Sequence, residues 1–276
     1  MNKPLVTVGV AVYNHERYVQ QCIESILDQD YENIELIIID DGSLDNSFSV
    51  IQAFLEQRGL PSHVHLSSRS NKGMCNTLNE IAKKSQGKYI SYIGSDDYWL
   101  SNKISDQVTY LETHPECTLV HSNSSRVDSQ GQFLKHMDYS GRDNSGNLFE
   151  AHIKRTGGIN TPSHLYRTSI FNDIGYYDPQ FRFEDTDFWL RLTKQHSVGF
   201  INTTHTCYRW HGENLSGQDN QIEFYFDELI AIYEKNIDDP ALRNYAVNRM
   251  CRKAIARSIK AMDLNSTKKY IAKLFA

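Results

Sequence analysis

Three nearly continuous apolar runs, each ending in polar or acidic residues, constrain this chain more than any other feature. They cover residues 5–12, 34–39 and 89–93. Runs without polar alternation are typical of strands covered on both faces, as in a parallel sheet. Between them, and beside a short strand at 64–66, apolar residues recur at helical spacing over 16–29, 45–58 and 73–84. The order predicts an α/β fold of nucleotide-binding type, with right-handed crossovers.

The rest of the chain is less regular but can still be divided into elements. Residues 128–150 are rich in Asp, Ser, Gly and Asn, so we expect a hairpin or a mobile loop there. Asp238-Asp239-Pro240 breaks a pattern that is otherwise helical from 221 almost to the end. The other predicted elements are helices over 103–113, 166–174, 185–194, 222–236 and 242–262, and strands over 118–122, 198–201 and 206–210.

Charge is distributed unevenly along the chain. The net charge is −5, yet residues 241–276 hold nine Lys and Arg against Asp263 alone, so the preceding part is strongly acidic. The basic end allows two interpretations: a solvated helix face with its lysines outward, or a peripheral contact with anionic lipid. An acidic body gives no reason to expect a nucleic-acid partner.

Composition narrows the remaining possibilities. Five scattered cysteines without a CxxC pair argue against a disulfide framework or a structural zinc site, so a reducing cytoplasm is the expected compartment. No stretch approaches the roughly 18 apolar residues of a membrane span. The N-terminal apolar run leads directly into Asn14-His15-Glu16-Arg17, which fits a first strand better than a signal peptide.

Acidic and polar residues stand where the predicted parallel strands end. The ends read Tyr13-Asn14, Asp40-Asp41 and Asp96-Asp97. Ligands of open α/β sheets bind beyond the carboxyl ends of the strands, so we expect these residues to face one crevice. Aspartate is also simply a good turn residue. Two acidic strand ends, with a third acidic cluster at Glu184-Asp185, favour a functional site.

The sequence lacks the usual phosphate-binding motifs, and this absence restricts how the crevice could bind a phosphate ligand. There is no GxxxxGK[ST] loop, no GxGxxG after a strand and no arginine-rich cradle for phosphate. An acidic cleft therefore binds a polyanion through a bridging cation. Carboxylate oxygens suit Mg²⁺ or Mn²⁺, which bind through one or two carboxylates together with substrate phosphates.

These motifs resemble the family 2 glycosyltransferases, which have the GT-A fold. The resemblance follows the family's order over about the first 215 residues and weakens after Ser216. The segments that carry it are Val6–Asn14, Ser25–Gln29, Ile37–Asp45, Asn71–Gly73, Leu78-Asn79, Gly87–Ile90, Gly94–Asp97 and Glu184–Arg191.

The resemblance implies a role for each matching position. Ala11, Tyr13, Asn14 and Asp41 would hold the nucleotide base, with the Asp41 carboxylate accepting the N3–H of a uracil-type ring. Asp96 would lie near the ribose and the donor sugar, and Gly73 and Glu184 would complete the nucleotide-sugar contacts. Asp97 and His211 would bind the metal, and Asp185 would be the general base. Asp96-Asp97 replaces the family's spaced Asp-x-Asp, so either carboxylate can be the direct metal ligand.

The implied function is metal-dependent, inverting transfer of a hexosyl or N-acetylhexosaminyl group. The donor would be a nucleotide-diphosphate sugar, most simply UDP-linked, with Mn²⁺ or Mg²⁺ as cofactor. The acceptor would be a saccharide or polyprenyl-linked saccharide in cell-surface polysaccharide synthesis, at the inner face of the cytoplasmic membrane. The alternatives are a sugar-nucleotidyltransferase, which needs a Gly-rich loop that Tyr13–Arg17 does not offer, and a non-catalytic carbohydrate-binding protein.

The expected domain organisation follows the same motifs. We predict a GT-A catalytic domain over 1–217, with a nucleotide-binding half over 1–100 and an acceptor half over 101–217. A basic helical region over 218–276 would be appended to it.

Overall fold

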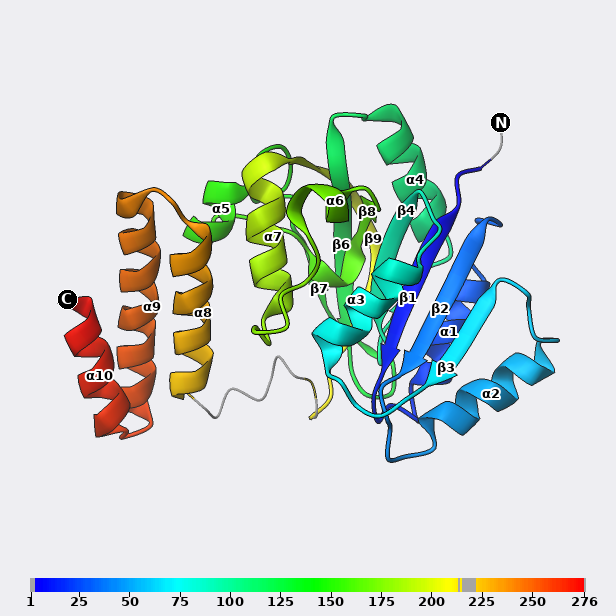
Figure 1. Cartoon of the computed structure of the whole chain (residues 1–276), viewed down its shortest axis with the longest axis horizontal. Coiled ribbons are helices and arrows are strands. Elements are labelled where there is room, and N and C mark those ends of the chain that lie inside the picture. Colours follow the sequence, from blue (N-terminus) through cyan, green and yellow to red (C-terminus); the bar gives the residue numbers. More distant parts are fainter. Residues whose placement is uncertain (1–2, 213, 215–221, 276) are drawn as a thin grey trace. The chain divides into compact units, whose positions relative to one another are not determined.

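The computed structural model of the chain describes residues 3–212, 214 and 222–275 (Figure 1). Its first part is a parallel sheet with helical crossovers, as predicted. The strands lie in the order β3-β2-β1-β4, and each adjacent pair is parallel. Strands β1 and β2 are buried along their whole length, which explains their continuous apolar sequences. The elements are β1 (Val6–Val12), α1 (Val19–Leu27), β2 (Ile34–Asp40), α2 (Ser47–Gln57), β3 (Val64–Ser68), α3 (Met74–Lys84) and β4 (Tyr89–Gly94).

Beyond β4 the sheet becomes mixed. β8 is antiparallel to both β4 and β6, β9 is parallel to β6, and β5 is antiparallel to β9. β7 pairs with β6 as the hairpin expected within 128–150. The described strands form one nine-stranded sheet. The elements are β5 (Tyr98–Trp99), α4 (Lys103–Thr113), β6 (Cys117–Val127), β7 (Phe133–Met137), α5 (Phe149–Lys154), the 3₁₀ turn Thr161–Ser163, β8 (His164–Arg167), α6 (Ile170–Ile174), α7 (Glu184–Gln195) and β9 (Ser197–Arg209).

Three predicted elements, one helix and two strands, differ from the structure. The expected helix over 166–174 is instead the strand β8 followed by the short helix α6. Apolar residues at helical spacing suggested one helix, but Leu165 and Tyr166 are fully buried where β8 pairs with both neighbours. The two strands expected at 198–201 and 206–210 are one strand, β9. The polar middle of β9 stays paired with β6, although the register of the pairing shifts between Ser122 and Ser124 of β6.

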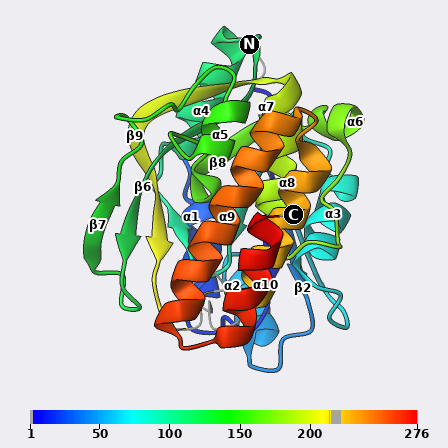
Figure 2. The same ribbon diagram turned by 90° about the vertical axis from the view of Figure 1, so that its left-hand side faces the viewer.

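The C-terminal segment forms three helices, α8 (Ile222–Asn236), α9 (Pro240–Lys260) and α10 (Leu264–Leu274). Figure 2 shows them side by side, and α9 packs against both of the others. The predicted break has a clear cause, because Pro240 begins α9 and the Asp239 carboxylate accepts a hydrogen bond from the Leu242 N–H at 2.6 Å. The predicted helices over 222–236 and 242–262 are confirmed in outline, and α10 is added to them.

The chain divides into two compact units. Unit 1 comprises residues 1–177 and 192–210, and unit 2 comprises residues 178–191 and 211–276. The first two turns of α7 belong to unit 2, together with the C-terminal helices. The predicted catalytic domain over 1–217 and helical region over 218–276 stay predictions.

All five cysteines are buried free thiols. Among the described residues, no helix combines the length and the apolar character needed to cross a membrane.

A buried polar network closes the amino-terminal edge of the parallel sheet. The Thr7 hydroxyl of β1 donates to the Glu35 carboxylate of β2 at 2.7 Å. The same oxygen accepts hydrogen bonds from the Ser85 hydroxyl at 2.7 Å and the Gly87 N–H at 3.0 Å. One hydroxyl thus uses its donor and both acceptor sites to join β1, β2 and the turn before β4.

Replacing Thr7 with Val should lower the free energy of unfolding by about 1–3 kcal/mol, because the shape is kept while buried Gly87 and Glu35 each lose a partner. Chemical denaturation measures the change. Thr109→Val on exposed α4 is the matched control, since it loses only a bond to the Ser105 carbonyl. It should change stability by less than about 0.5 kcal/mol. Equal effects of the two substitutions would contradict the role of Thr7.

Candidate active site

The loop after β1 is held against the loop after β2. The Asn14 side-chain oxygen accepts a hydrogen bond from the Leu44 N–H at 2.7 Å, and the Asn14 N–H donates to the Ser43 hydroxyl at 3.0 Å. Asn14 has a φ of 56°, a left-handed conformation that Asn adopts more readily than most residues. Ala11 pairs with the ends of both β2 and β4, and Tyr13 is exposed. These three residues therefore lie at the carboxyl edge of the sheet.

Asp41 is a buried carboxylate that faces the start of α3. It accepts hydrogen bonds from the Lys72 N–H at 2.8 Å and the Gly73 N–H at 2.9 Å, and it also pairs with Arg69. Gly73 has a φ of 85°, which glycine adopts without steric cost. Three of the roughly four acceptor positions of the carboxylate are thereby used, which leaves one for a ligand. The Asp41 carboxylate and the Gly73 backbone are thus directly bonded to each other.

The carboxylates of Asp96 and Asp97 converge above Gly94. A Cβ atom on Gly94 would lie 2.7 Å from Asp96 Oδ1 and 3.3 Å from Asp97 Oδ2. Burial and the negative charge of Asp96 raise the pKa of Asp97 well above its ordinary value, although Arg209 opposes the shift. Two neighbouring carboxylates of this kind provide the hard oxygen donors that divalent cations prefer.

Arg209, the last residue of β9, holds this acidic loop in place. Its backbone N–H donates to Asp97 Oδ1 at 2.7 Å, and its Nε donates to the Asp96 carbonyl at 2.8 Å. Its Nη2 donates to the Gln21 side chain of α1 at 2.6 Å. The buried guanidinium therefore ties the acidic pair to β9 and α1.

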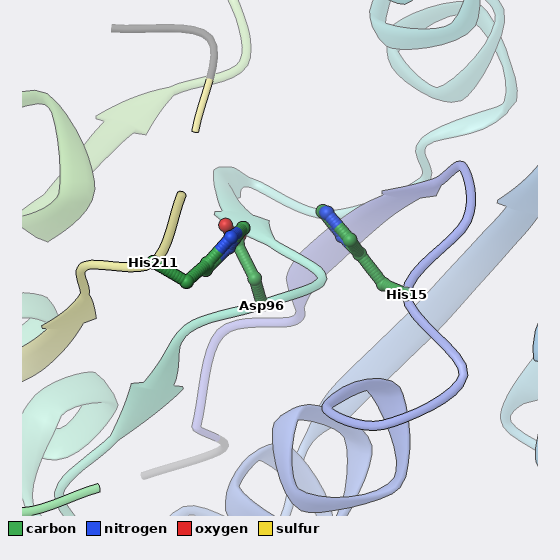
Figure 3. Close-up of side chains that lie close together, drawn as sticks. All are labelled: His15, Asp96 and His211. Atoms are coloured by element: carbon green, nitrogen blue, oxygen red, sulfur yellow. The ribbon is translucent and has the colours of Figure 1, made fainter. Parts of the chain in front are cut away.

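Figure 3 shows that His15 and Asp96 come from two loops at this edge, those after β1 and β4. His15 Nδ1 lies 2.7 Å from the Ser95 hydroxyl. A ring nitrogen of His15 and a carboxylate oxygen of Asp96 lie within 4.8 Å of each other. His15 therefore adds an imidazole to the oxygen donors of this edge.

In unit 2, Asp185 lies in the first turn of α7, beside Glu184 and Asp187. The Thr186 hydroxyl donates to Asp185 Oδ1 at 3.2 Å. Negative side chains are stabilised at this end of a helix by the backbone dipole. Partial burial, followed by the charges of Asp185 and Glu228, raises the pKa of Glu184 to about 8. The shift favours the neutral, protonated form of Glu184 over the ionised form.

Helix α8 fixes this end of α7 by hydrogen bonds and ion pairs. The fully buried Asp187 carboxylate accepts from Arg191 Nε at 2.9 Å, from Lys235 Nζ at 2.8 Å and from Asn236 Nδ2 at 2.9 Å. Glu228 of α8 accepts from the N–H groups of two residues just before α7, Arg182 and Phe183. Asp187 is thus an anchor of the helix that carries Asp185.

The predicted site residues fall into two groups. Those at the carboxyl edge of the sheet in unit 1 are Ala11, Tyr13, Asn14, Asp41, Gly73, Asp96 and Asp97. Those in unit 2 are Glu184, Asp185 and His211. The His211 N–H donates to the Asn214 side chain at 2.6 Å.

Sequence reasoning missed the supporting residues. We expected no arginine-rich cradle for phosphate, yet Arg69 and Arg209 both lie at this edge. Both bind carboxylates or carbonyls of the protein itself. His15 was overlooked although it follows Asn14 directly. The sequence around Glu228 does not indicate its role, because its partners lie more than forty residues away in the chain.

Comparison with known proteins identifies the class of protein that this fold and edge define. A family model described as "Glycosyl transferase family 2" matches residues 7–175, more than half of the chain. The chain therefore belongs to this family of glycosyltransferases, and the family resemblance seen in the sequence is confirmed.

Solved structures support the fold. One is S. aureus TarS 1–349 in complex with UDP-GlcNAc, with a TM-score of 0.68 at 18% identity over 89% of this chain and 71% of that chain. Another is the mannosyltransferase PcManGT from Pyrobaculum calidifontis in complex with GDP-Man and Mn²⁺, with a TM-score of 0.62 at 15% identity over 99% of this chain and 80% of that chain. The predicted α/β fold of GT-A type is confirmed.

Curated relatives match over shorter stretches. The Escherichia coli enzyme "UDP-Glc:alpha-D-GlcNAc-diphosphoundecaprenol beta-1,3-glucosyltransferase WfaP" is 36% identical over 109 residues, which cover 40% of this chain and 42% of WfaP. For two other glycosyltransferase relatives, the matched part spans only 29% and 53% of their length.

The anchoring of α7 can be tested by changing Asp187. Asp187→Asn should lower the free energy of unfolding by about 2 kcal/mol or more, because a buried carboxylate that accepts three charged or amide donors loses its charge. Asp178→Asn is the matched control, since Asp178 bonds the same Lys235 from a more exposed position. It should cost less than about 1 kcal/mol. Thermal and urea denaturation compare the two, and an equal loss would refute the anchor.

Proposed function

We propose that this chain transfers a sugar from a nucleotide-diphosphate donor to a saccharide or lipid-linked acceptor, with inversion at the anomeric carbon. The observation that carries the proposal is the convergence of the Asp96 and Asp97 carboxylates over Gly94, at the same sheet edge as Asp41. Ligands of such sheets bind at this edge. Membership of the glycosyltransferase family supports the reaction class.

The proposed donor is a UDP-linked hexose or N-acetylhexosamine. The remaining acceptor position of Asp41 would take the N3–H of uracil, while Ala11, Tyr13 and Asn14 would border the base and Gly73 the nucleotide. TarS in complex with UDP-GlcNAc and the UDP-Glc of the WfaP name support this nucleotide. Asp96 would contact the ribose and the sugar, and Glu184, whose raised pKa favours its protonated form, would donate a hydrogen bond to a sugar oxygen.

The proposed cofactor is Mn²⁺ or Mg²⁺. The oxygen-rich, like-charged pair above Gly94 fits a hard divalent cation, and an ion there would relieve the repulsion between the two carboxylates. Asp97, with Asp96 beside it, would hold the ion, and we add His211 because it follows Arg209 by only two residues in the chain. An ion held there would supply positive charge to the diphosphate and to the departing oxygen. PcManGT in complex with Mn²⁺ supports this choice.

Asp185 is the proposed general base. The Asp185 carboxylate, in the first turn of α7, would take the proton of an acceptor hydroxyl as the hydroxyl oxygen attacks the anomeric carbon. The bond to the diphosphate breaks in the same displacement, which inverts that carbon. The anchors from α8 hold the helix that carries this carboxylate.

The remaining assignments follow from this reaction. Residues 1–100 would serve the nucleotide, residues 101–217 the acceptor, and residues 218–276 would form an appended helical region. The acceptor would be a growing cell-surface saccharide, in keeping with the polyprenol-linked acceptor in the WfaP name. The basic segment 241–276 would bring the protein to the inner face of the cytoplasmic membrane.

Asp185→Asn should lower turnover by about 10²–10⁴-fold, because the amide cannot take the acceptor's proton. Release of UDP from a UDP-sugar measures turnover, and calorimetry should show donor affinity within about twofold of the parent chain. Asp178→Asn removes a carboxylate of the same unit and should keep near-normal turnover. A near-normal rate in the Asp185 variant would remove it as the base.

Chelation of divalent ions should abolish slow UDP-sugar hydrolysis, and added Mn²⁺ should restore it. Gly94→Ala should need at least about tenfold more Mn²⁺, because its Cβ would meet Asp96 Oδ1 at 2.7 Å. Gly141→Ala is the control, since a Cβ there has no atom within 4 Å. Hydrolysis that continues undiminished in a chelator would exclude the metal role.

A further inference from the structure

One face of α9, from Tyr245 to Lys260, carries four basic residues and is called the basic stripe here. At 3.6 residues per turn, the residues of this face fall within one stripe, and several of them line a shallow pocket. The opposite face, with Ala246, Met250 and Ala254, is buried in unit 2. The stripe consists of Tyr245, Asn248, Arg249, Arg252, Lys253, Ala256, Ile259 and Lys260.

The stripe carries no acidic residue of its own, because helix α9 contains no Asp or Glu along residues 240–260. Arg252, Lys253 and Lys260 of the stripe are exposed. The stripe is therefore an exposed face whose charged side chains are all positive.

The turn between α9 and α10 carries exposed apolar side chains. Ile259 is 61% exposed, Met262 89% and Leu264 71%. All three lie within six residues, next to Lys260 and with Lys268 one turn further along α10. Exposed apolar side chains next to cations are typical of segments that bind a membrane interface.

We propose that the α9 stripe and the apolar tip Ile259–Leu264 bind an anionic lipid surface, with the tip inserted among the acyl chains. The inference deepens the membrane contact in the proposed function, since it names the face and the lipid charge. Charge complementarity selects anionic lipid, because each cation near such a surface adds to the attraction. The tip explains why lipid fits better than a soluble polyanion, which would leave three apolar side chains in water.

The test is co-sedimentation of the full chain with sucrose-loaded vesicles. Phosphatidylcholine vesicles with phosphatidylglycerol should bind the chain, binding should fall as salt rises, and pure phosphatidylcholine should bind it weakly. Arg252→Gln with Lys260→Gln, and separately Met262→Ser with Leu264→Ser, should each weaken binding about tenfold or more. All four positions are exposed, so circular dichroism should show an unchanged fold.

Matched controls remove the same side-chain types elsewhere. Arg58→Gln with Lys84→Gln takes two exposed cations from unit 1, and Phe133→Ser with Leu134→Ser takes two exposed apolar side chains from β7. Neither should change vesicle binding by more than about twofold. Equal binding by all variants, or no preference for anionic vesicles, would overturn the proposal.

Self-association is the competing use of this surface. If sedimentation velocity without lipid shows a dimer that the Met262→Ser, Leu264→Ser variant dissociates, the tip is an interface between copies and the lipid proposal fails. The vesicle assay contains no nucleotide sugar, so its result is independent of the transferase proposal. UDP-sugar hydrolysis in solution should be unchanged in the α9 and tip variants, which separates failure of the lipid contact from failure of the reaction.

Discussion

The repulsion between two neighbouring carboxylates is the constraint on which the proposed site depends. Asp96 and Asp97 converge over Gly94, and burial raises the pKa of Asp97. Such an arrangement costs free energy unless something compensates for it. Arg209 supplies part of the compensation through its backbone and its guanidinium. A divalent ion with a diphosphate would supply the rest, which is why we regard the pair as a binding site rather than as a turn.

At the same edge, backbone groups fix the direction of another carboxylate. Asp41 is oriented by the N–H groups of Lys72 and Gly73, so its direction depends on the start of α3. In unit 2, Asp187 and Glu228 serve the helix of Asp185 in a comparable way. In both places few residues are proposed to contact the substrate, and the residues that orient them come from distant parts of the chain.

Much of the parallel half could be predicted from sequence, because buried strands have continuous apolar runs and Asp-rich ends mark their carboxyl edge. The mixed half could not. β8 was mistaken for helix because its pairing partners β4 and β6 are far away in sequence, and β9 seemed interrupted because polar residues follow a bulge. The positions of Asp41, Asp96 and Asp97 followed from strand ends, whereas Arg209 and Glu228 act through backbone contacts that leave no local pattern.

Calorimetric titration of the chain with UDP measures whether the acidic edge binds a diphosphate through a divalent cation. The titration is run with Mn²⁺, without divalent ions, and with Asp97→Asn in the presence of Mn²⁺. We expect tight binding only for the parent chain with Mn²⁺, and binding at least about tenfold weaker in the other two arms. Equal affinity in all three would mean that the acidic edge does not hold a diphosphate through a cation, and the proposed site would have to be abandoned.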